Sequence, residues 1–215
     1  MPGRPGAVVG RDAGKGGINV TRRFAVTWDY RCPFARNVHE ALIKGLREGK
    51  EWDVRFLAFS LDQVHLEEGE TPAWERDLDD RSVTGVRALL WGIAVRETFP
   101  QHFLDFHAAV FGARHDEGQK IAEEWVLRAA AEKVGLDPCA VAAEVASGGP
   151  VKILEAEHTE AVNQHAVFGV PTIIEGDEAV FVRLMERGRV DDLEQALSLV
   201  GSTRLNEFKR TKIPR

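Results

Sequence analysis

The sequence predicts an α/β fold in which a β-α-β unit, a helical block, a β-hairpin and a last helix follow one another. Residues 22–28 and 52–60 are rich in β-forming residues, and residues 33–49 between them have a helical pattern. Residues 170–184 have the pattern of two strands joined by a tight turn, and residues 190–201 that of an amphipathic helix. This order predicts one α/β domain that carries a large helical insertion.

The β-α-β unit is justified element by element. Residues 22–28 form the first strand, which ends in the turn before Pro33. Proline fits the first turn of a helix because its missing N–H has no intrahelical partner there. The second strand, residues 52–60, has apolar side chains on both faces, which is typical of a covered parallel strand. The helix between the strands presents one apolar stripe of Val38, Ala41, Leu42 and Leu46.

The middle of the chain is a polar connection followed by helices. Residues 61–79 are predicted as a loop with one turn around Trp74. Glycines and prolines then separate five helical patterns, at residues 81–98, 100–113, 117–134, 138–147 and 150–167. The predicted organisation is an N-terminal tail (1–21), an α/β domain (22–60 and 168–201), a loop and helical insertion (61–167) and a basic C-terminal tail (202–215).

Composition and charge argue against some classes of partner. The chain has 215 residues, of which 44% are hydrophobic and 29% charged, as in ordinary soluble globular proteins. The net charge is −6, and the acidic body argues against nucleic acid as a partner. No apolar run is long enough to span a membrane, and the N-terminus lacks the apolar stretch of a signal peptide. We therefore expect no membrane partner and a cytoplasmic location.

The number and spacing of the cysteines and histidines predict neither a disulfide scaffold nor a metal site. The two cysteines, Cys32 and Cys139, are too few for a disulfide scaffold, and Cys139 is expected to be buried. The spacing of the seven histidines does not match paired metal-ligand motifs. We therefore expect surface or half-buried histidines and no metal site.

Three features of the sequence carry a family resemblance. Cys32-Pro33 opens the first helix directly after the first strand, Phe34 follows as an aromatic residue, and Val170-Pro171 opens the third strand. In this order, and with a helical block between, they resemble the DsbA-like family. The implied fold is thioredoxin-like, with an all-helical insertion between the second and third strands.

The resemblance has one departure, at Ala35. This residue stands where the second cysteine of a Cys-x-x-Cys motif would be, so that the motif reads Cys-Pro-Phe-Ala. The chain looks closer to the cytoplasmic, FrnE-like branch than to the periplasmic enzymes. The 2-hydroxychromene-2-carboxylate isomerases and kappa-class glutathione transferases share the inserted fold, but they usually have serine at the position of Cys32 and use a bound thiol cofactor.

The helix N-terminus is expected to activate Cys32. Unpaired N–H groups and the helix dipole favour a thiolate there, which predicts a lowered pKa of the thiol. Arg31 and Arg36 flank the cysteine, and Arg36 lies one turn on, where it could reach the sulfur or a bound anion. Ala35 cannot resolve a mixed disulfide, so either an external thiol does so or Cys32 acts without redox turnover.

The resemblance also implies the surroundings of the sulfur. A cis peptide bond between Val170 and Pro171 would expose the backbone of Val170 to a substrate peptide or to glutathione. We expect Tyr30, Pro33, Phe34 and Arg36 to line the substrate site with them. Asp29 is either a buried acid that tunes the thiol or a solvated turn residue. A cleft under the helical insertion would suit a small hydrophobic substrate or a peptide.

The leading hypothesis is a DsbA-like thiol-disulfide oxidoreductase with Cys32 as the nucleophile. Its partners would be a disulfide-bearing or small hydrophobic substrate and a low-molecular-weight thiol such as glutathione, with no tightly bound cofactor. The alternatives are a glutathione-dependent isomerase or transferase of the same fold, and a non-catalytic binding module with a degenerate site. The sequence leaves the choice between a monomer and a homodimer open.

Overall fold

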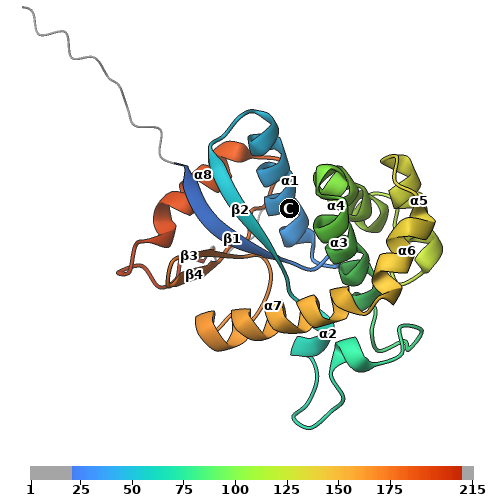
Figure 1. The fold of residues 1–215 in the computed structure, drawn as a ribbon. Coiled ribbons are helices and arrows are strands. Elements are labelled where there is room, and N and C mark those ends of the chain that lie inside the picture. Colours follow the sequence, from blue (N-terminus) through green and yellow to red (C-terminus); the bar gives the residue numbers. More distant parts are fainter. Residues whose placement is uncertain (1–20, 210–215) are drawn as a thin grey trace, which may run out of the picture.

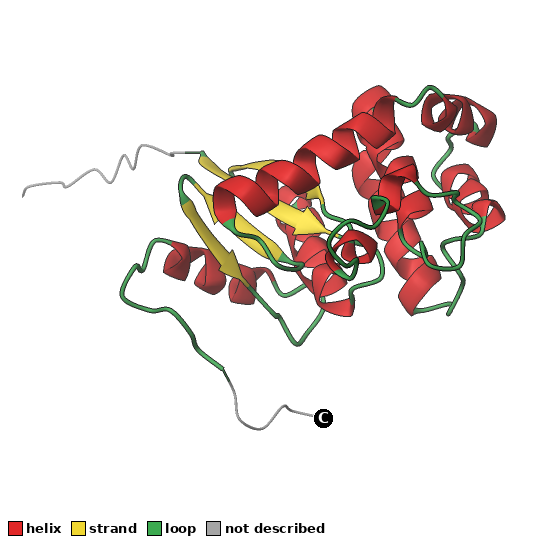
Figure 2. Ribbon diagram, turned by 90° about the horizontal axis from the view of Figure 1, so that it is seen from below, coloured by secondary structure: helices red, strands yellow, loops and turns green. Residues whose placement is uncertain are grey.

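The computed structural model describes residues 21–209, which form a four-stranded sheet flanked by helices (Figures 1 and 2). The predicted tail over residues 1–20 and the last residues of the predicted C-terminal tail, 210–215, lie outside this range. Strand β1 (Arg22–Trp28) pairs in parallel with β2 (Trp52–Ala58), and helix α1 (Pro33–Arg47) connects them. The predicted parallel β-α-β unit is therefore confirmed.

The C-terminal hairpin completes the sheet. Strand β3 (Thr172–Glu175) runs antiparallel to β1, and β4 (Glu178–Phe181) runs antiparallel to β3, so the strand order is β2-β1-β3-β4. Gly176 has a φ of 62° in the tight turn between β3 and β4, a conformation that glycine adopts without strain. Helix α8 (Val190–Val200) follows and, together with α1, covers one face of the sheet, while α7 crosses the other face (Figure 2).

The segment between β2 and β3 contains the five helices that the sequence predicts. The two short helices that precede them are α2 (Leu61–Val64), within a segment predicted as a loop, and the 3-10 helix η1 (Ala73–Glu75), at the predicted turn around Trp74. Ser60 caps α2, because its hydroxyl accepts a hydrogen bond from the backbone N–H of Gln63 at 3.2 Å. The five longer helices are α3 (Val86–Thr98), α4 (Pro100–His115), α5 (Glu124–Lys133), α6 (Pro138–Ala146) and α7 (Gly149–His165).

Two of these helices begin later than their patterns indicate. Helix α3 begins at Val86 rather than near residue 81, and α5 begins at Glu124 rather than near residue 117. Gly118 has a φ of 68°, which interrupts a helix, and the turn that follows buries Ile121. The buried side chain of Ile121 lies in this turn at a spacing that continues the apolar pattern of α5. The sequence therefore predicted that the helix begins earlier than it does.

Helix α3 lies at the centre of the insertion, and all of residues 88–95 are buried. A helix that is apolar on every side is typical of such a central position. Within the insertion, Arg96 of α3 forms an ion pair with Glu157 of α7, with 2.8 Å between the charged atoms, and Arg96 also donates to the carbonyl oxygen of Phe56 in β2. Glu157 also accepts a hydrogen bond from the N–H of Ala58 at the end of β2. Within residues 21–209, no helix has the length and apolar character needed to cross a membrane.

Candidate functional site

Cys32 lies at the N-terminus of α1, where it is the capping residue of the helix. Its sulfur accepts a hydrogen bond from the N–H of Ala35 at 3.4 Å, and its thiol donates to the carbonyl oxygen of Val170 at 3.3 Å. The peptide bond between Val170 and Pro171 is cis. The fold thus brings the Cys32 sulfur against the segment that leads into β3, although 138 residues separate the two in the sequence.

Asp29 is fully buried in the turn before Cys32, which decides between the two alternatives for this residue. Its carboxylate accepts hydrogen bonds from the backbone N–H groups of Arg31 and Leu61, each at 2.9 Å. The Arg31 guanidinium pairs with Asp29 and also bonds to Asp62 and Thr84. Arg31 is therefore occupied in joining this turn to the segment before α3, and it is not directed at the sulfur.

The prediction of a lowered thiol pKa is wrong. Burial of the half-exposed Cys32 side chain raises the pKa of its thiol, because desolvation disfavours the thiolate. Hydrogen bonds from the N–H groups of Ala35 and Phe34 oppose this effect, as does the charge of Arg183, while the charge of Asp29 adds to it. The helix N-terminus therefore acts in the expected direction, but desolvation outweighs it.

This environment predicts an alkaline titration of the sulfur. The rate at which Cys32 reacts with iodoacetamide should keep rising beyond pH ~8.5, the pKa of an unperturbed thiol, because the thiolate forms late. The rate is followed at the Cys32 peptide by mass spectrometry, with a short cysteine peptide as the reference. A midpoint near pH ~7 or below would contradict the assignment of desolvation as the dominant effect.

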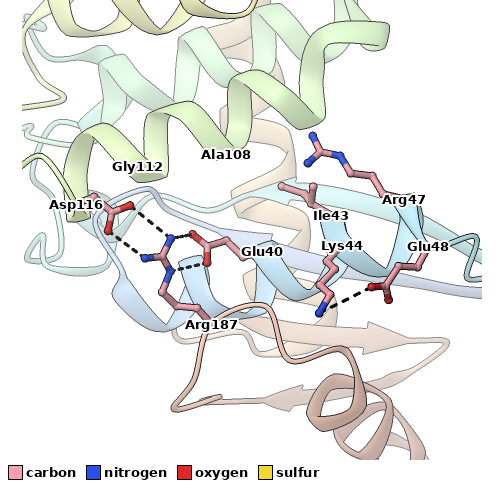
Figure 3. Close-up of a pocket in the computed structure, with 9 residues that line it drawn as sticks. All are labelled: Glu40, Ile43, Lys44, Arg47, Glu48, Ala108, Gly112, Asp116 and Arg187. Atoms are coloured by element: carbon pink, nitrogen blue, oxygen red, sulfur yellow. Dashed lines mark hydrogen bonds and ion pairs between the residues drawn. The ribbon is translucent and has the colours of Figure 1, made fainter.

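Arg36 does not reach the sulfur, contrary to the expectation from its position one turn on. Its buried guanidinium bonds to Glu40 at 2.9 Å and to Asp116 at the end of α4. Arg187 lies between the same two carboxylates and bonds to both (Figure 3). Two acids on separate elements therefore hold Arg36 within this network, away from the sulfur that we expected it to reach.

The network borders a groove between α1 and α4 with a volume of about 480 Å³ (Figure 3). Cys32 is not among the residues of this groove, and charged side chains predominate in it. The groove is therefore not the apolar cleft beside the sulfur that the sequence led us to expect. Its lining residues are Glu40, Ile43, Lys44, Arg47, Glu48, Ala108, Gly112, Asp116 and Arg187.

Tyr30, which we expected to line the substrate site, is fully buried and has no exposed surface in this structure. Tyr30 belongs to a chain of hydrogen bonds that ends at the carbonyl oxygen of Thr27. Because this oxygen can only accept, it determines which atom donates in each of the other bonds. His39 Nε2 donates to that oxygen at 3.2 Å, and His107 Nε2 donates to His39 Nδ1 at 3.0 Å. The Tyr30 hydroxyl then donates to His107 Nδ1 at 2.8 Å.

Three histidines are more buried than expected. His39, His107 and His158 are each less than 7% exposed, although the sequence suggested surface or half-buried positions. Burial lowers the pKa of His39 and of His158 to about 4, and it holds the pKa of His107 well below its usual value. All three are therefore neutral at physiological pH and belong to the core rather than to the site.

The side chains that do surround the sulfur come from α1 and from the hairpin. Pro33 is exposed and Phe34 is half-buried, directly after Cys32. The Arg183 guanidinium lies over the rings of Phe34 and Phe181, with 5.1 Å to each ring centroid. Sequence reasoning missed Arg183, because nothing in its local pattern shows that the end of the hairpin returns to the start of α1.

Cys139 is exposed at the start of α6, contrary to the prediction that it is buried. Arg128 approaches its sulfur, with 3.7 Å between the guanidinium nitrogen and Sγ. Both cysteines are free thiols. Within residues 21–209, no group of three or more His, Cys, Asp or Glu side chains is arranged to hold a metal ion.

Comparison with known proteins places this fold in a family. The family described as the DSBA-like thioredoxin domain matches residues 26–198. Among curated proteins, none matches the sequence. Similar solved structures include a 2-hydroxychromene-2-carboxylate isomerase, which is 20% identical with a TM-score of 0.59, the alignment covering 82% of this chain and 94% of that one.

Two further solved structures have a comparable likeness to the chain. A thioredoxin-like oxidoreductase from Silicibacter pomeroyi DSS-3 is 17% identical, with a TM-score of 0.52 and coverage of 82% of this chain and 86% of that one. DsbA from Pseudomonas aeruginosa is 18% identical, with a TM-score of 0.56 and coverage of 86% and 85%. These likenesses confirm the predicted thioredoxin-like fold. Because the family match spans most of its length, the chain belongs to the DSBA-like thioredoxin domain family.

Proposed function

We propose that the protein is a thiol-disulfide oxidoreductase that acts through the single sulfur of Cys32 and an external thiol. The observation that carries this proposal is the contact between the Cys32 thiol and the carbonyl oxygen of Val170. It places the half-exposed Cys32, at the start of a helix, beside the buried segment that leads through a cis-proline into β3. Membership in the DSBA-like family supports the same reaction class.

The proposed reaction has two exchange steps. The Cys32 thiol first loses its proton to solvent, and the thiolate attacks one sulfur of a disulfide. The S–S bond of the substrate breaks, one half leaves as a thiolate that takes up a proton, and a mixed disulfide joins the other half to Cys32. An external thiolate then attacks the substrate sulfur of this mixed disulfide, which releases Cys32 as a thiolate. The substrate half leaves as a new disulfide with the external thiol.

The absence of a second cysteine in the motif makes the external thiol necessary. Ala35 is fully buried, and its N–H is already bonded to the Cys32 sulfur, so it contributes a hydrogen bond but no resolving group. Glutathione or another low-molecular-weight thiol would fill this role as a co-substrate rather than as a tightly bound cofactor. Such a cycle needs a compartment that supplies reduced thiols, which agrees with the cytoplasmic location that we expect from the sequence.

The segment before β3 would position the substrate. The carbonyl oxygen of Val170 faces the Cys32 thiol, and hydrogen bonds to the backbone of such a segment are a common way to hold an extended peptide. Pro33 and Phe34 would provide apolar contacts on the side of α1. Tyr30 would contribute indirectly, by fixing the turn that leads to Cys32 from within the core.

A steady-state exchange assay tests this proposal. Reduction of a small mixed disulfide in the presence of glutathione should fall to the uncatalysed rate in Cys32→Ser, because the nucleophile is lost. The matched control is Cys139→Ser, which removes the other free thiol and should leave the rate unchanged. The rate should also rise with pH from about 7 to about 9, since only the thiolate attacks. Full activity in Cys32→Ser would overturn the proposal.

A thiol-dependent isomerase is the second candidate, favoured by the likeness to 2-hydroxychromene-2-carboxylate isomerase and by the missing second cysteine. In that reaction the bound thiol cofactor performs the chemistry, and the residue at position 32 need only hydrogen-bond to its sulfur. Cys32→Ser would then keep substantial isomerase activity. The same variant therefore separates the two candidates, because the exchange reaction does not survive it.

A further inference from the structure

Arg183 places a positive charge beside the proposed site, and the proposed reaction gives this charge no role. It follows β4, in the segment that returns toward the start of α1, and it is exposed. Its guanidinium lies over the ring of Phe34, the second residue after Cys32, and over the ring of Phe181. Its charge is close enough to Cys32 to favour the thiolate. A cation is thus held beside the reactive sulfur.

The backbone on both sides of Arg183 is anchored. The N–H of Val182 donates to the carbonyl oxygen of Pro171 at 3.0 Å, which ties this segment to the residue beside the Val170–Cys32 contact. The carbonyl oxygen of Leu184 accepts a hydrogen bond from the side chain of Asn37 on α1 at 2.8 Å, and Leu184 itself is buried. Arg183 therefore starts from a fixed point between the cis-proline segment and α1.

The guanidinium has no carboxylate partner among residues 21–209, unlike its neighbours. Arg31 pairs with Asp29 and Asp62, and Arg187 pairs with Glu40 and Asp116. Its contacts with the two aromatic rings leave its N–H groups without a hydrogen-bond acceptor among the described residues. A guanidinium group with unpaired N–H donors can bind a carboxylate through two parallel hydrogen bonds.

We propose that Arg183 is a specificity-determining residue that binds a carboxylate on the thiol or disulfide that reacts with Cys32. This inference rests on the proposed exchange reaction and names its substrate class, which is an anionic sulfur compound with a carboxylate near its sulfur. Neutral or cationic partners would react at Cys32 without this contact. The residue acts on the partner molecule, and the exchange chemistry itself remains at the Cys32 sulfur.

Paired alkylating agents test the inference without requiring disulfide exchange. Iodoacetate and iodoacetamide both alkylate a thiolate with loss of iodide. They differ only in that iodoacetate carries a carboxylate where iodoacetamide carries a neutral amide. The ratio of their rate constants at Cys32, read from the Cys32 peptide by mass spectrometry, cancels any change in the thiolate fraction. We expect Arg183→Ala to lower the iodoacetate-to-iodoacetamide ratio roughly fivefold, because a solvent-screened charge contact is lost. Arg183→Lys should lower the ratio less, because lysine keeps the charge but not the planar group.

Two controls make the result specific. Arg81→Ala removes another exposed arginine, in the loop before α3, and should leave the ratio at Cys32 unchanged. Cys139, which is exposed on the insertion, serves within the same molecule as a thiol whose ratio should not respond to Arg183→Ala. High salt should reduce the wild-type ratio toward that of Arg183→Ala, because screening weakens exposed charge contacts.

The outcomes separate this inference from the proposed function. An unchanged ratio in Arg183→Ala, or an equal fall in Arg81→Ala, overturns the role of Arg183 even if Cys32 exchanges disulfides. A ratio that depends on Arg183, in a protein whose Cys32 does not react with disulfides, supports recognition of an anion and overturns the exchange reaction. A ratio that depends on Arg183 together with faster exchange for anionic than for cationic disulfides supports both.

Discussion

Lowering the pH from about 7 to about 4.5 should cost the fold several kcal/mol of its free energy of unfolding. His39 is fully buried and neutral, and its pKa is about 4 against an ordinary value of 6.5. The unfolded chain therefore binds a proton at a higher pH than the folded chain. The stability that neutral His39 contributes is complete above pH 6.5 and is lost as the pH falls toward about 4.

The size of this loss follows from the shift. His39 alone accounts for about 3 kcal/mol between the two pKa values, at ~1.4 kcal/mol for each pH unit. His158, with a pKa of about 4, and His107 titrate in the same direction. Denaturant unfolding at a series of pH values, followed by circular dichroism, measures the effect.

Histidine variants test whether the buried histidines cause this loss of stability at low pH. His39→Gln should be less stable than the wild type at neutral pH, because His107 loses its acceptor, but its stability should fall less steeply with acid. The exposed His65 offers a matched control, and His65→Gln should keep the wild-type slope. An identical slope in His39→Gln and in the wild type would show that buried histidines are not the cause.

Replacing Gly92 by alanine should destabilise the protein by about 3 kcal/mol, the upper part of the range for overpacked cores. Gly92 lies in α3, and a Cβ atom there would come 2.5 Å from the Tyr30 hydroxyl oxygen and 3.1 Å from its ring. The ring cannot move aside easily, because it is fully buried, packs against Phe111 and is held by His107. Thermal or denaturant unfolding of the purified variant measures the loss.

A second glycine provides the control for this substitution. Gly112 in α4 has no atom nearer than 3.9 Å to the position of its Cβ, so Gly112→Ala should be neutral or should stabilise the helix by up to ~1 kcal/mol. In the Gly92→Ala background, Tyr30→Phe removes the oxygen that the new methyl group meets. The double variant should therefore lose less stability than the two single variants together, and simple additivity would contradict the proposed clash.

The order of elements and the site of the sulfur could be predicted from the sequence, because both depend on local signals. Pro33 and the stripe of α1 fix the start of the helix, and Cys32 takes its place from them. The hairpin follows from the turn at Gly176, which the structure places between β3 and β4. The likeness of Val170-Pro171 to the family motif then indicated which distant segment faces the sulfur.

The directions of buried side chains could not be predicted, because they depend on partners far along the chain. Arg36 faces Asp116, which lies 80 residues away, and Tyr30 bonds to His107, which lies 77 residues away. The raised pKa of Cys32 depends on desolvation, which spacing does not reveal. One signal was available for His39, since it lies three residues before Leu42, next to the apolar stripe of α1.

The formation and release of a mixed disulfide at Cys32 tests the central claim most directly. The reduced protein is mixed with glutathione disulfide, and the intact mass and the Cys32 peptide are followed in time, before and after reduced glutathione is added. Our account predicts one glutathione adduct on Cys32, its loss after the addition, and a release rate that rises with the concentration of the external thiol. An adduct confined to Cys139, or one on Cys32 that persists in excess glutathione, would contradict it.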